Sequence, residues 1–178
     1  MGAALFPDTT VVVNFAAIDE LDLLRRYLHD DGRVVEAVHH EITRSAERVP
    51  HLARLDLKQW FGDPVAFDSD ADIAAIDGVR IGVFGGSAAE PLKHLGESQT
   101  VRAITSRSEF SDATWITDDR DAFQFARARM LVTRDTMDVL EVLVANAELS
   151  PDRAYFICME MLDAGRSLRR APTSPRHF

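Results

Sequence analysis

The stretch Ala113-Thr114-Trp115-Ile116-Thr117-Asp118-Asp119 joins a run of apolar and β-branched residues to a pair of carboxylates. A pattern of helical spacing follows at residues 122–128, and the run Met130-Leu131-Val132-Thr133 then has the composition of a second strand. A strand, a helix and a strand in this order predict a βαβ unit, in which the two strands are parallel. This region therefore predicts an α/β fold with a mainly parallel central sheet.

The same alternation extends toward both ends of the chain. Short apolar runs predict strands at residues 3–6, 33–37 and 79–84. Apolar residues at helical spacing predict helices over these further ranges: 18–28, 38–49, 71–76, 97–108, 137–147 and a segment that begins at Pro151 after the N-cap Ser150. Helices on both faces of such a sheet would make a three-layer α/β/α sandwich.

The length of 178 residues, 46% of them hydrophobic, suits one domain with a full core. We expect residues 1–165 to form this domain, with 52–86 as a variable middle stretch, and residues 166–178 to be a disordered basic tail. No signal peptide is expected, and no apolar run approaches the roughly 20 residues that cross a membrane. The single cysteine, Cys158, lies on an apolar helical face, which predicts a packed core thiol. One cysteine cannot form an internal disulfide, so the composition fits a reducing cytoplasm.

Acidic residues stand far apart in the chain, each at a strand end or in the first turns of a predicted helix: Asp8, Glu41, Glu97 and the Asp118-Asp119 pair. Ligands of parallel sheets bind beyond the carboxyl ends of the strands, where Asp8 and Asp119 would project. The positive end of a helix dipole tolerates Glu41 and Glu97 near the same edge. Carboxylates gathered in this way hold Mg²⁺ or Mn²⁺ for phosphodiester hydrolysis. The pattern therefore favours a nuclease.

Each acid also has a simpler interpretation when taken alone. An aspartate after a strand is often a turn former or a helix cap, and Glu41 alone would be a solvated helix charge. Their joint occurrence favours a site. The net charge of −9 argues against broad binding of nucleic acid, although metal ions would change the local sign. Arg44 and Arg48 follow Glu41 by one and two turns, and they either contact phosphates or pair with Glu47 at the surface. For the arginines of the tail, two roles stay open: they bind RNA backbone or a partner, or they are solvated. These are Arg166, Arg169, Arg170 and Arg176.

Several blocks occur together in a characteristic order: Leu5-Phe6-Pro7-Asp8-Thr9-Thr10, Val35-Glu36-Ala37-Val38-His39-His40-Glu41-Ile42, Leu95-Gly96-Glu97-Ser98-Gln99-Thr100, Trp115-Ile116-Thr117-Asp118-Asp119-Arg120 and the segment 132–140. In this order they resemble the PIN-domain ribonucleases, the family that includes VapC-type toxins. The resemblance covers most of the chain apart from the middle stretch and the tail. Gln99 departs from it, because one branch of the family often has a second glutamate there.

The resemblance implies a PIN-like fold and a metal-dependent endoribonuclease that hydrolyses RNA phosphodiester bonds. It implies that one or two Mg²⁺ or Mn²⁺ ions bind to Asp8, Glu41, Glu97 and Asp119, with Asp118 assisting its neighbour. Thr9, Asn14 and Thr117 would hydrogen-bond the carboxylates or a metal-bound water. The implied setting is the toxin half of a toxin–antitoxin pair, a homodimer inhibited by a small antitoxin. Two alternatives remain, a PIN nuclease of RNA processing or repair without an antitoxin, and a non-catalytic binding protein of the same fold.

Overall fold

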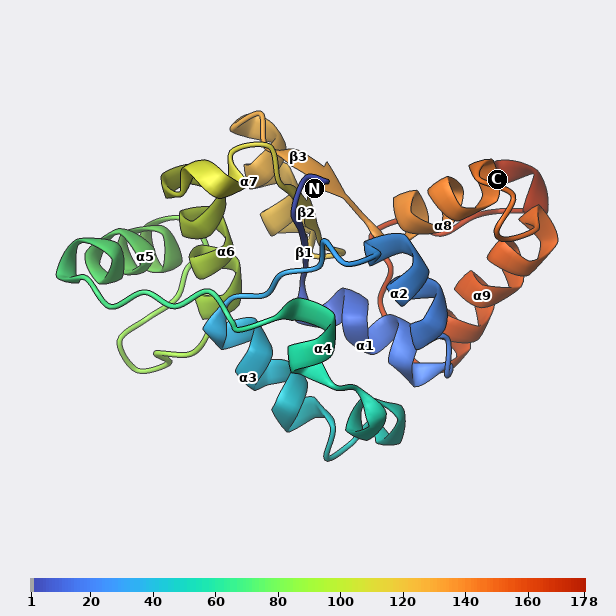
Figure 1. The fold of residues 1–178 in the computed structure, drawn as a ribbon, viewed down its shortest axis with the longest axis horizontal. Helices are drawn as coiled ribbons and strands as arrows, with labels where there is room; N and C mark the ends of the chain where they lie inside the picture. The colour runs from blue at the N-terminus through green and yellow to red at the C-terminus, as the bar shows by residue number, and fades with distance from the viewer. Residues whose placement is uncertain (1) are drawn as a thin grey trace.

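The computed structural model describes residues 2–178, and three parallel strands stand at its centre (Figure 1). The strands are β1 (Leu5–Pro7), β2 (Thr114–Ile116) and β3 (Val132–Arg134), in the spatial order β1-β2-β3. Leu5 pairs with Thr114, and Thr114 pairs with Val132, so all three strands end at the same edge of the sheet. The predicted α/β class and parallel sheet are confirmed.

Helices surround this small sheet (Figure 1). Their bounds are α1 (Thr9–Ala17), α2 (Leu21–Leu28), α3 (Glu36–Ser45), α4 (Leu57–Phe61), α5 (Asp70–Gly82), α6 (Leu95–Ser106), α7 (Arg120–Ala128), α8 (Thr136–Ala145) and α9 (Pro151–Asp163). Single 3₁₀ turns are η1 (Pro50–Arg54), η2 (Ser108–Phe110) and η3 (Pro175–His177). In Figure 1, α5, α6 and α7 lie to the left of the strands, and α8 and α9 lie to the right.

The strand expected at residues 33–37 is wrong, although its first residues do lie beside the sheet. The backbone of Arg33 donates to Leu5 O, and Leu5 forms an isolated parallel bridge with Gly32. Val35 bridges to Val65 instead, so the segment changes partner after two residues and no ladder develops. Helix α3 then begins at Glu36.

The strand expected at residues 79–84 is also wrong, because helix α5 continues through Gly82. The hydroxyl of Ser69 accepts from the Asp72 N–H and caps the helix. Ile76 and Arg80 turn inward, whereas Ile81 and Val83 are exposed. Arg80 pairs with Asp77 in this buried position. The alternation of apolar residues is typical of a strand, but in the structure these residues belong to a helix and its end, where Val79 and Phe84 are half-buried and Ile81 and Val83 are exposed.

One apolar core lies between the helices and the sheet. Its largest buried side chains include Trp115 of β2, Phe6 of β1 and Phe15 of α1. Cys158 is fully buried in α9, which confirms the predicted core thiol. The same helix begins as predicted, because the Ser150 hydroxyl accepts from the Arg153 N–H and Pro151 occupies the first helical position. Among residues 2–178, no helix is long and apolar enough to span a membrane.

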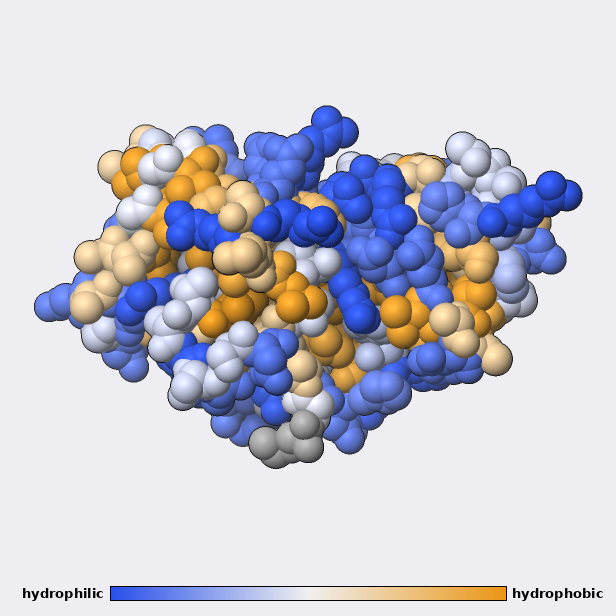
Figure 2. All heavy atoms as spheres, turned by 90° about the horizontal axis from the view of Figure 1, so that it is seen from above, coloured by the Kyte–Doolittle hydropathy of each residue, from blue (hydrophilic) through white to orange (hydrophobic). Residues whose placement is uncertain are grey.

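Exposed apolar side chains occur in several places, among them Met130 and Val132 at β3 and Phe156 on α9. Exposed apolar residues of α5 and the loop after it are Ile73, Ile81, Val83 and Leu92. Figure 2 shows orange spheres at the left end of the molecule, the end where α5 lies in Figure 1.

The chain after α9, where a disordered basic tail was expected, turns back over the domain. Arg166 donates to Asn14 of α1, and Arg169 and Arg170 form ion pairs with Asp135. We call residues 165–170 the C-terminal arm. Its contacts with α1 and with the start of α8 give these residues a fixed position.

Candidate active site

Asp8 lies at the carboxyl end of β1 and is almost fully buried. Its N–H donates to Ile116 O of β2 over 2.8 Å, so the residue remains attached to the sheet edge. Its carboxylate accepts from the Thr9 N–H at 2.8 Å and caps α1. The Thr117 hydroxyl, one residue beyond β2, donates to the other oxygen at 3.3 Å. Asp8 is therefore both a helix cap and a carboxylate fixed where ligands of parallel sheets bind.

Glu41 and Glu97 reach toward Asp8 from two neighbouring helices. The Thr9 hydroxyl donates to Glu41 over 2.6 Å. Glu97 lies in the first turn of α6, and one of its oxygens is 3.3 Å from His94 Nδ1. Helix α6 approaches α3 closely at Gly96, where an added Cβ would lie 3.0 Å from Val38 Cγ2 and 3.5 Å from Glu41 Oε1. The glycine thus lets the two helices bring their glutamates together.

Repulsion among these carboxylates shows in their acid–base properties. Burial raises the pKa of Asp8 well above its usual range, and the charges of Glu97 and Glu41 raise it further. Burial also raises the pKa of Glu41, as does Glu97, while the hydroxyl of Thr9 opposes the shift. Three negative groups at a buried edge are stable together only when a proton or a cation offsets part of their charge.

The chemistry of this group suits a hard divalent cation. Within residues 2–178, no three His, Cys, Asp or Glu side chains are arranged around a common metal position. Oxygens of Glu41 and Glu97 contact Thr9 and His94 instead. The donor set nevertheless consists of carboxylates beside a buried negative charge, which is what Mg²⁺ and Mn²⁺ prefer. Asp8, Glu41 and Glu97 are the residues that would hold the ion.

Asp119 lies next to this group and is joined to it through Thr117. The Asp119 N–H donates to the Thr117 hydroxyl at 3.1 Å, and that hydroxyl donates in turn to Asp8. One Asp119 oxygen accepts from the Ala122 N–H at 2.7 Å and caps α7. Of the predicted acidic positions, the structure brings Asp8, Glu41 and Glu97 together and places Asp119 at the neighbouring strand end.

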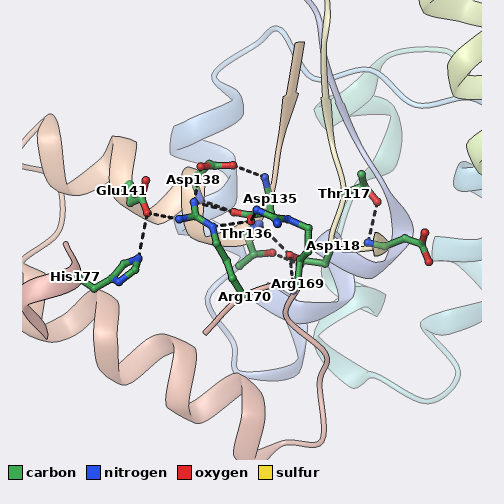
Figure 3. Close-up of polar contacts among 10 residues, drawn as sticks. Thr117, Asp118, Asp135, Thr136, Asp138, Glu141, Arg169, Arg170 and His177 are labelled. Atoms are coloured by element: carbon green, nitrogen blue, oxygen red, sulfur yellow. Dashed lines mark hydrogen bonds and ion pairs between the residues drawn. The ribbon is translucent and has the colours of Figure 1, made fainter. Parts of the chain in front are cut away.

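Asp118 has a different environment from the other acids (Figure 3). Its two oxygens accept from Asn14 Nδ2 at 2.9 Å, from the hydroxyl and N–H of Thr136, and from the N–H of Arg169. A carboxylate has about four lone-pair positions, and these contacts occupy them. Asp118 therefore joins α1, α8 and the C-terminal arm, and its expected role of assisting Asp119 beside a metal stays a prediction.

The predicted supporting residues each contact a carboxylate: Thr9 contacts Glu41, Thr117 contacts Asp8, and Asn14 contacts Asp118. Gln99 does not occupy the place of an additional acid. Its side-chain oxygen accepts from the Ala37 N–H at 2.9 Å and so satisfies a free donor in the first turn of α3.

Asp135 was missed by the sequence reasoning. It begins α8 with a capping box, in which its side chain accepts from the Asp138 N–H and Asp138 accepts from the Asp135 N–H. Its fully buried carboxylate also pairs with Arg169 and Arg170 (Figure 3). The order Asp135-Thr136-Met137-Asp138 before an apolar run is a capping signal that could have been read from the sequence.

Two open cavities lie on either side of Arg166. The first has a volume of about 380 Å³ and is lined by Thr9, Thr10, Val13, Glu41, Arg44, Ser45, Glu47, Arg48, Val49 and Arg166. The second, of about 350 Å³, is lined by Thr10, Asp118, Asp119, Arg120, Gly165, Arg166 and Ser167. Because Thr10 and Arg166 line both, the two cavities adjoin each other and lead from Glu41 to Asp119.

The chain was compared with models of protein families, with curated proteins and with solved structures, and none of the three comparisons gives a match.

Proposed function

We propose that this protein is a metal-dependent nuclease of the PIN type that hydrolyses phosphodiester bonds of RNA. One observation supports the proposal above all others. Asp8, Glu41 and Glu97 come from distant parts of the chain and interact at the carboxyl edge of a parallel sheet. Burial and the neighbouring negative charges raise the pKa of Asp8 and Glu41, so the group is favourable only when a proton or a cation offsets part of its charge.

The carboxylates would hold the cation, and the neighbouring threonines orient the carboxylates. A divalent cation, when bound, would supply an acidified water and stabilise negative charge on the phosphate. Thr9 fixes one oxygen of Glu41, and Thr117 orients Asp8. Asp119, at the next strand end, lines the adjoining cavity into which substrate would extend. The proposal includes a three-layer arrangement of helices around the sheet, as the resemblance to PIN domains implies.

The biological setting is part of the proposal and rests on the resemblance alone. We propose a toxin of a toxin–antitoxin pair in the cytoplasm, acting as a homodimer and inhibited by a small antitoxin. A gene for a small DNA-binding protein immediately upstream would favour this setting over RNA processing or repair.

The enzymatic proposal is tested by incubating total RNA with the purified protein and Mg²⁺ or Mn²⁺, and by mapping the ends that form. We expect Asp8→Asn, Glu41→Gln and Asp119→Asn each to lower the cleavage rate by about 100-fold or more, since removal of one transition-state contact typically costs this much. Asp70→Asn, at an exposed position of α5, serves as the matched control and should cleave like wild type. An absence of cleavage, or equal cleavage by Asp8→Asn, would refute the nuclease proposal.

A further inference from the structure

Three arginines line the cavity that begins at Glu41. Arg44 comes from the last turn of α3, Arg48 from the turn after it, and Arg166 from the C-terminal arm. We propose that these three arginines bind a backbone phosphate of the nucleic acid next to the phosphate that is cleaved. This inference rests on the proposed function and assigns the substrate-binding side of the same site.

Arg44 and Arg48 are exposed, and their guanidinium groups are available for a ligand. The sequence alone leaves open that they pair with Glu47. Among residues 2–178 no ion pair joins either arginine to an acid, although the charge of Arg44 acts on nearby Glu41 and opposes the rise in the pKa of that carboxyl. In a chain with a net charge of −9, arginines without such partners beside a cavity are suited to an incoming anion.

Arg166 is held in place between the two cavities. Its Nε donates to Asn14 Oδ1 at 3.1 Å, and Asn14 donates in turn to Asp118 and to Ser167 O. This contact uses one N–H of the guanidinium and leaves its terminal amino groups for another acceptor. A guanidinium anchored in this way is preorganised, so less side-chain entropy is lost when it binds a phosphate.

Several features of the cavity favour a phosphate of a polynucleotide over an acidic side chain of a partner protein. The hydroxyls of Thr10 and Ser45 also line this cavity and can donate to phosphate oxygens, whereas the hydroxyl of Thr9 already donates to Glu41. The adjoining cavity leads past Arg166 to Asp119 and Arg120, so a chain with repeated anionic groups can follow both. Glu41 lines the first cavity and Asp119 lines the second, so such a chain would lie beside two of the acids of the proposed site.

The test measures RNA binding without cleavage. A labelled single-stranded RNA is titrated by fluorescence anisotropy into the Asp8→Asn protein and into the same protein carrying Arg44→Ala, Arg48→Ala or Arg166→Ala. We expect each single variant to weaken binding by about 5- to 30-fold at low salt. Because the three arginines bind one phosphate, loss of all three together should lower the slope of log K against log salt by about 0.7. Arg166→Lys, which keeps the charge, should recover part of the loss and separates a binding defect from a folding defect. Thermal melting of each variant verifies that it is folded.

Arg26→Ala is the charge-matched control, because Arg26 is an exposed arginine of α2 that lines neither cavity. It should change affinity by less than about twofold, as expected for a charge remote from the ligand. The inference is overturned if the three cavity variants bind RNA as this control does, or if the Asp8→Asn protein binds an acidic peptide through these arginines and binds no RNA.

The two proposals can fail separately. Cleavage of RNA by wild type with unchanged binding by the arginine variants would refute the phosphate site and leave the nuclease standing. Binding that depends on the three arginines without any cleavage would refute the nuclease and leave a phosphate-binding site.

Discussion

Replacing Asp135 with alanine should destabilise the protein by about 2–4 kcal/mol, although Asp135 is not part of the proposed site. Its side chain is fully buried and accepts from the Asp138 N–H at 2.8 Å. It also pairs with Arg169 and Arg170, which reach it from the C-terminal arm (Figure 3). One carboxylate therefore caps α8 and anchors the end of the chain.

The magnitude follows from these two roles. Loss of a helix cap costs about 1 kcal/mol. Loss of hydrogen bonds to charged partners costs about 1.5–3 kcal/mol. Breaking a fully buried pair would cost about 3–5 kcal/mol, but Arg169 and Arg170 retain 25% and 32% of their side-chain exposure and regain water when released. The expected destabilisation by Asp135→Ala is therefore placed below the value for a fully buried ion pair.

Asp135→Asn separates the two roles, because asparagine caps helices as well as aspartate does but carries no charge. Urea unfolding followed by circular dichroism measures both variants. With a slope of about 2 kcal/mol per molar urea, the alanine variant should lower the midpoint by about 1–2 M, and the asparagine variant by less.

The effect should also depend on pH. Burial by itself would raise the pKa of Asp135, but hydrogen bonds from Arg170 and the Asp138 backbone and the charges of Arg170 and Arg169 outweigh it, so the pKa is lowered. A carboxyl whose folded pKa lies below its unfolded value of about 3.9 stabilises the fold above that value. This stabilisation is lost as the pH falls through the folded pKa. The gap between wild type and Asp135→Asn should therefore close at low pH. A cost below about 1 kcal/mol for Asp135→Ala, or a gap that is the same at pH 7 and pH 3, would refute this reasoning.

Further predictions concern the acidic group, the helix contact and the thiol. Because the pKa of Asp8 is raised on folding, its ionisation destabilises the fold as the pH rises through that pKa. Without metal, the Asp8→Asn variant should therefore have a higher melting temperature than wild type at pH 7, and the difference should vanish in acid. Mg²⁺ should raise the melting temperature of wild type more than that of the variant. Gly96→Ala should lower the free energy of unfolding, measured in urea, by about 1–3 kcal/mol, since the new Cβ would lie 3.0 Å from Val38. Gly78→Ala has open space around it and should stabilise α5 by about 0.5–1 kcal/mol. Equal effects of the two changes would contradict the close approach of α6 to α3. Burial raises the pKa of Cys158 to about 12, so a thiol reagent should label it only after unfolding, and rapid labelling of native protein would be inconsistent with its packing.

The sequence predicted those parts of the fold whose signals are local. Strand β2 and the start of α9 have clear local signals, a β-branched run and an N-cap followed by proline, and both formed where expected. Residues 33–37 and 79–84 failed because a short apolar run fits a strand, a bridge or one side of a helix equally well. Contacts distant in sequence, such as that of Val35 with Val65, decided between these outcomes.

Local sequence signals also fail to predict the contacts of single carboxylate side chains. Asp118 and Asp119 both follow β2 and both line the second cavity, and nothing in their order shows which of them makes hydrogen bonds to three other segments and which caps α7. The difference arises from Asn14, which is 104 positions away in the chain, and from Thr136 at the start of α8. Gln99 likewise matched a position of an expected acid, yet it contacts the first turn of α3. The sequence motifs indicated which residues follow the strands. The direction in which each side chain points depends on its packing against distant segments.

The C-terminal arm connects the stability of the fold with the proposed binding of phosphate. Asp135 anchors Arg169 and Arg170, and Asp118 accepts from the Arg169 N–H, so the backbone of the arm is attached to the start of α8 and to the residue after β2. Arg166 lies only three residues before Arg169 and contacts Asn14, which itself binds Asp118. The guanidinium between the two cavities is thus positioned through Asn14 and the arm by the carboxylates of Asp118 and Asp135. Acids in this protein accordingly serve in two different ways. Asp8, Glu41 and Glu97 gather negative charge where a cation can neutralise it, while Asp118 and Asp135 use theirs to place an arginine beside them.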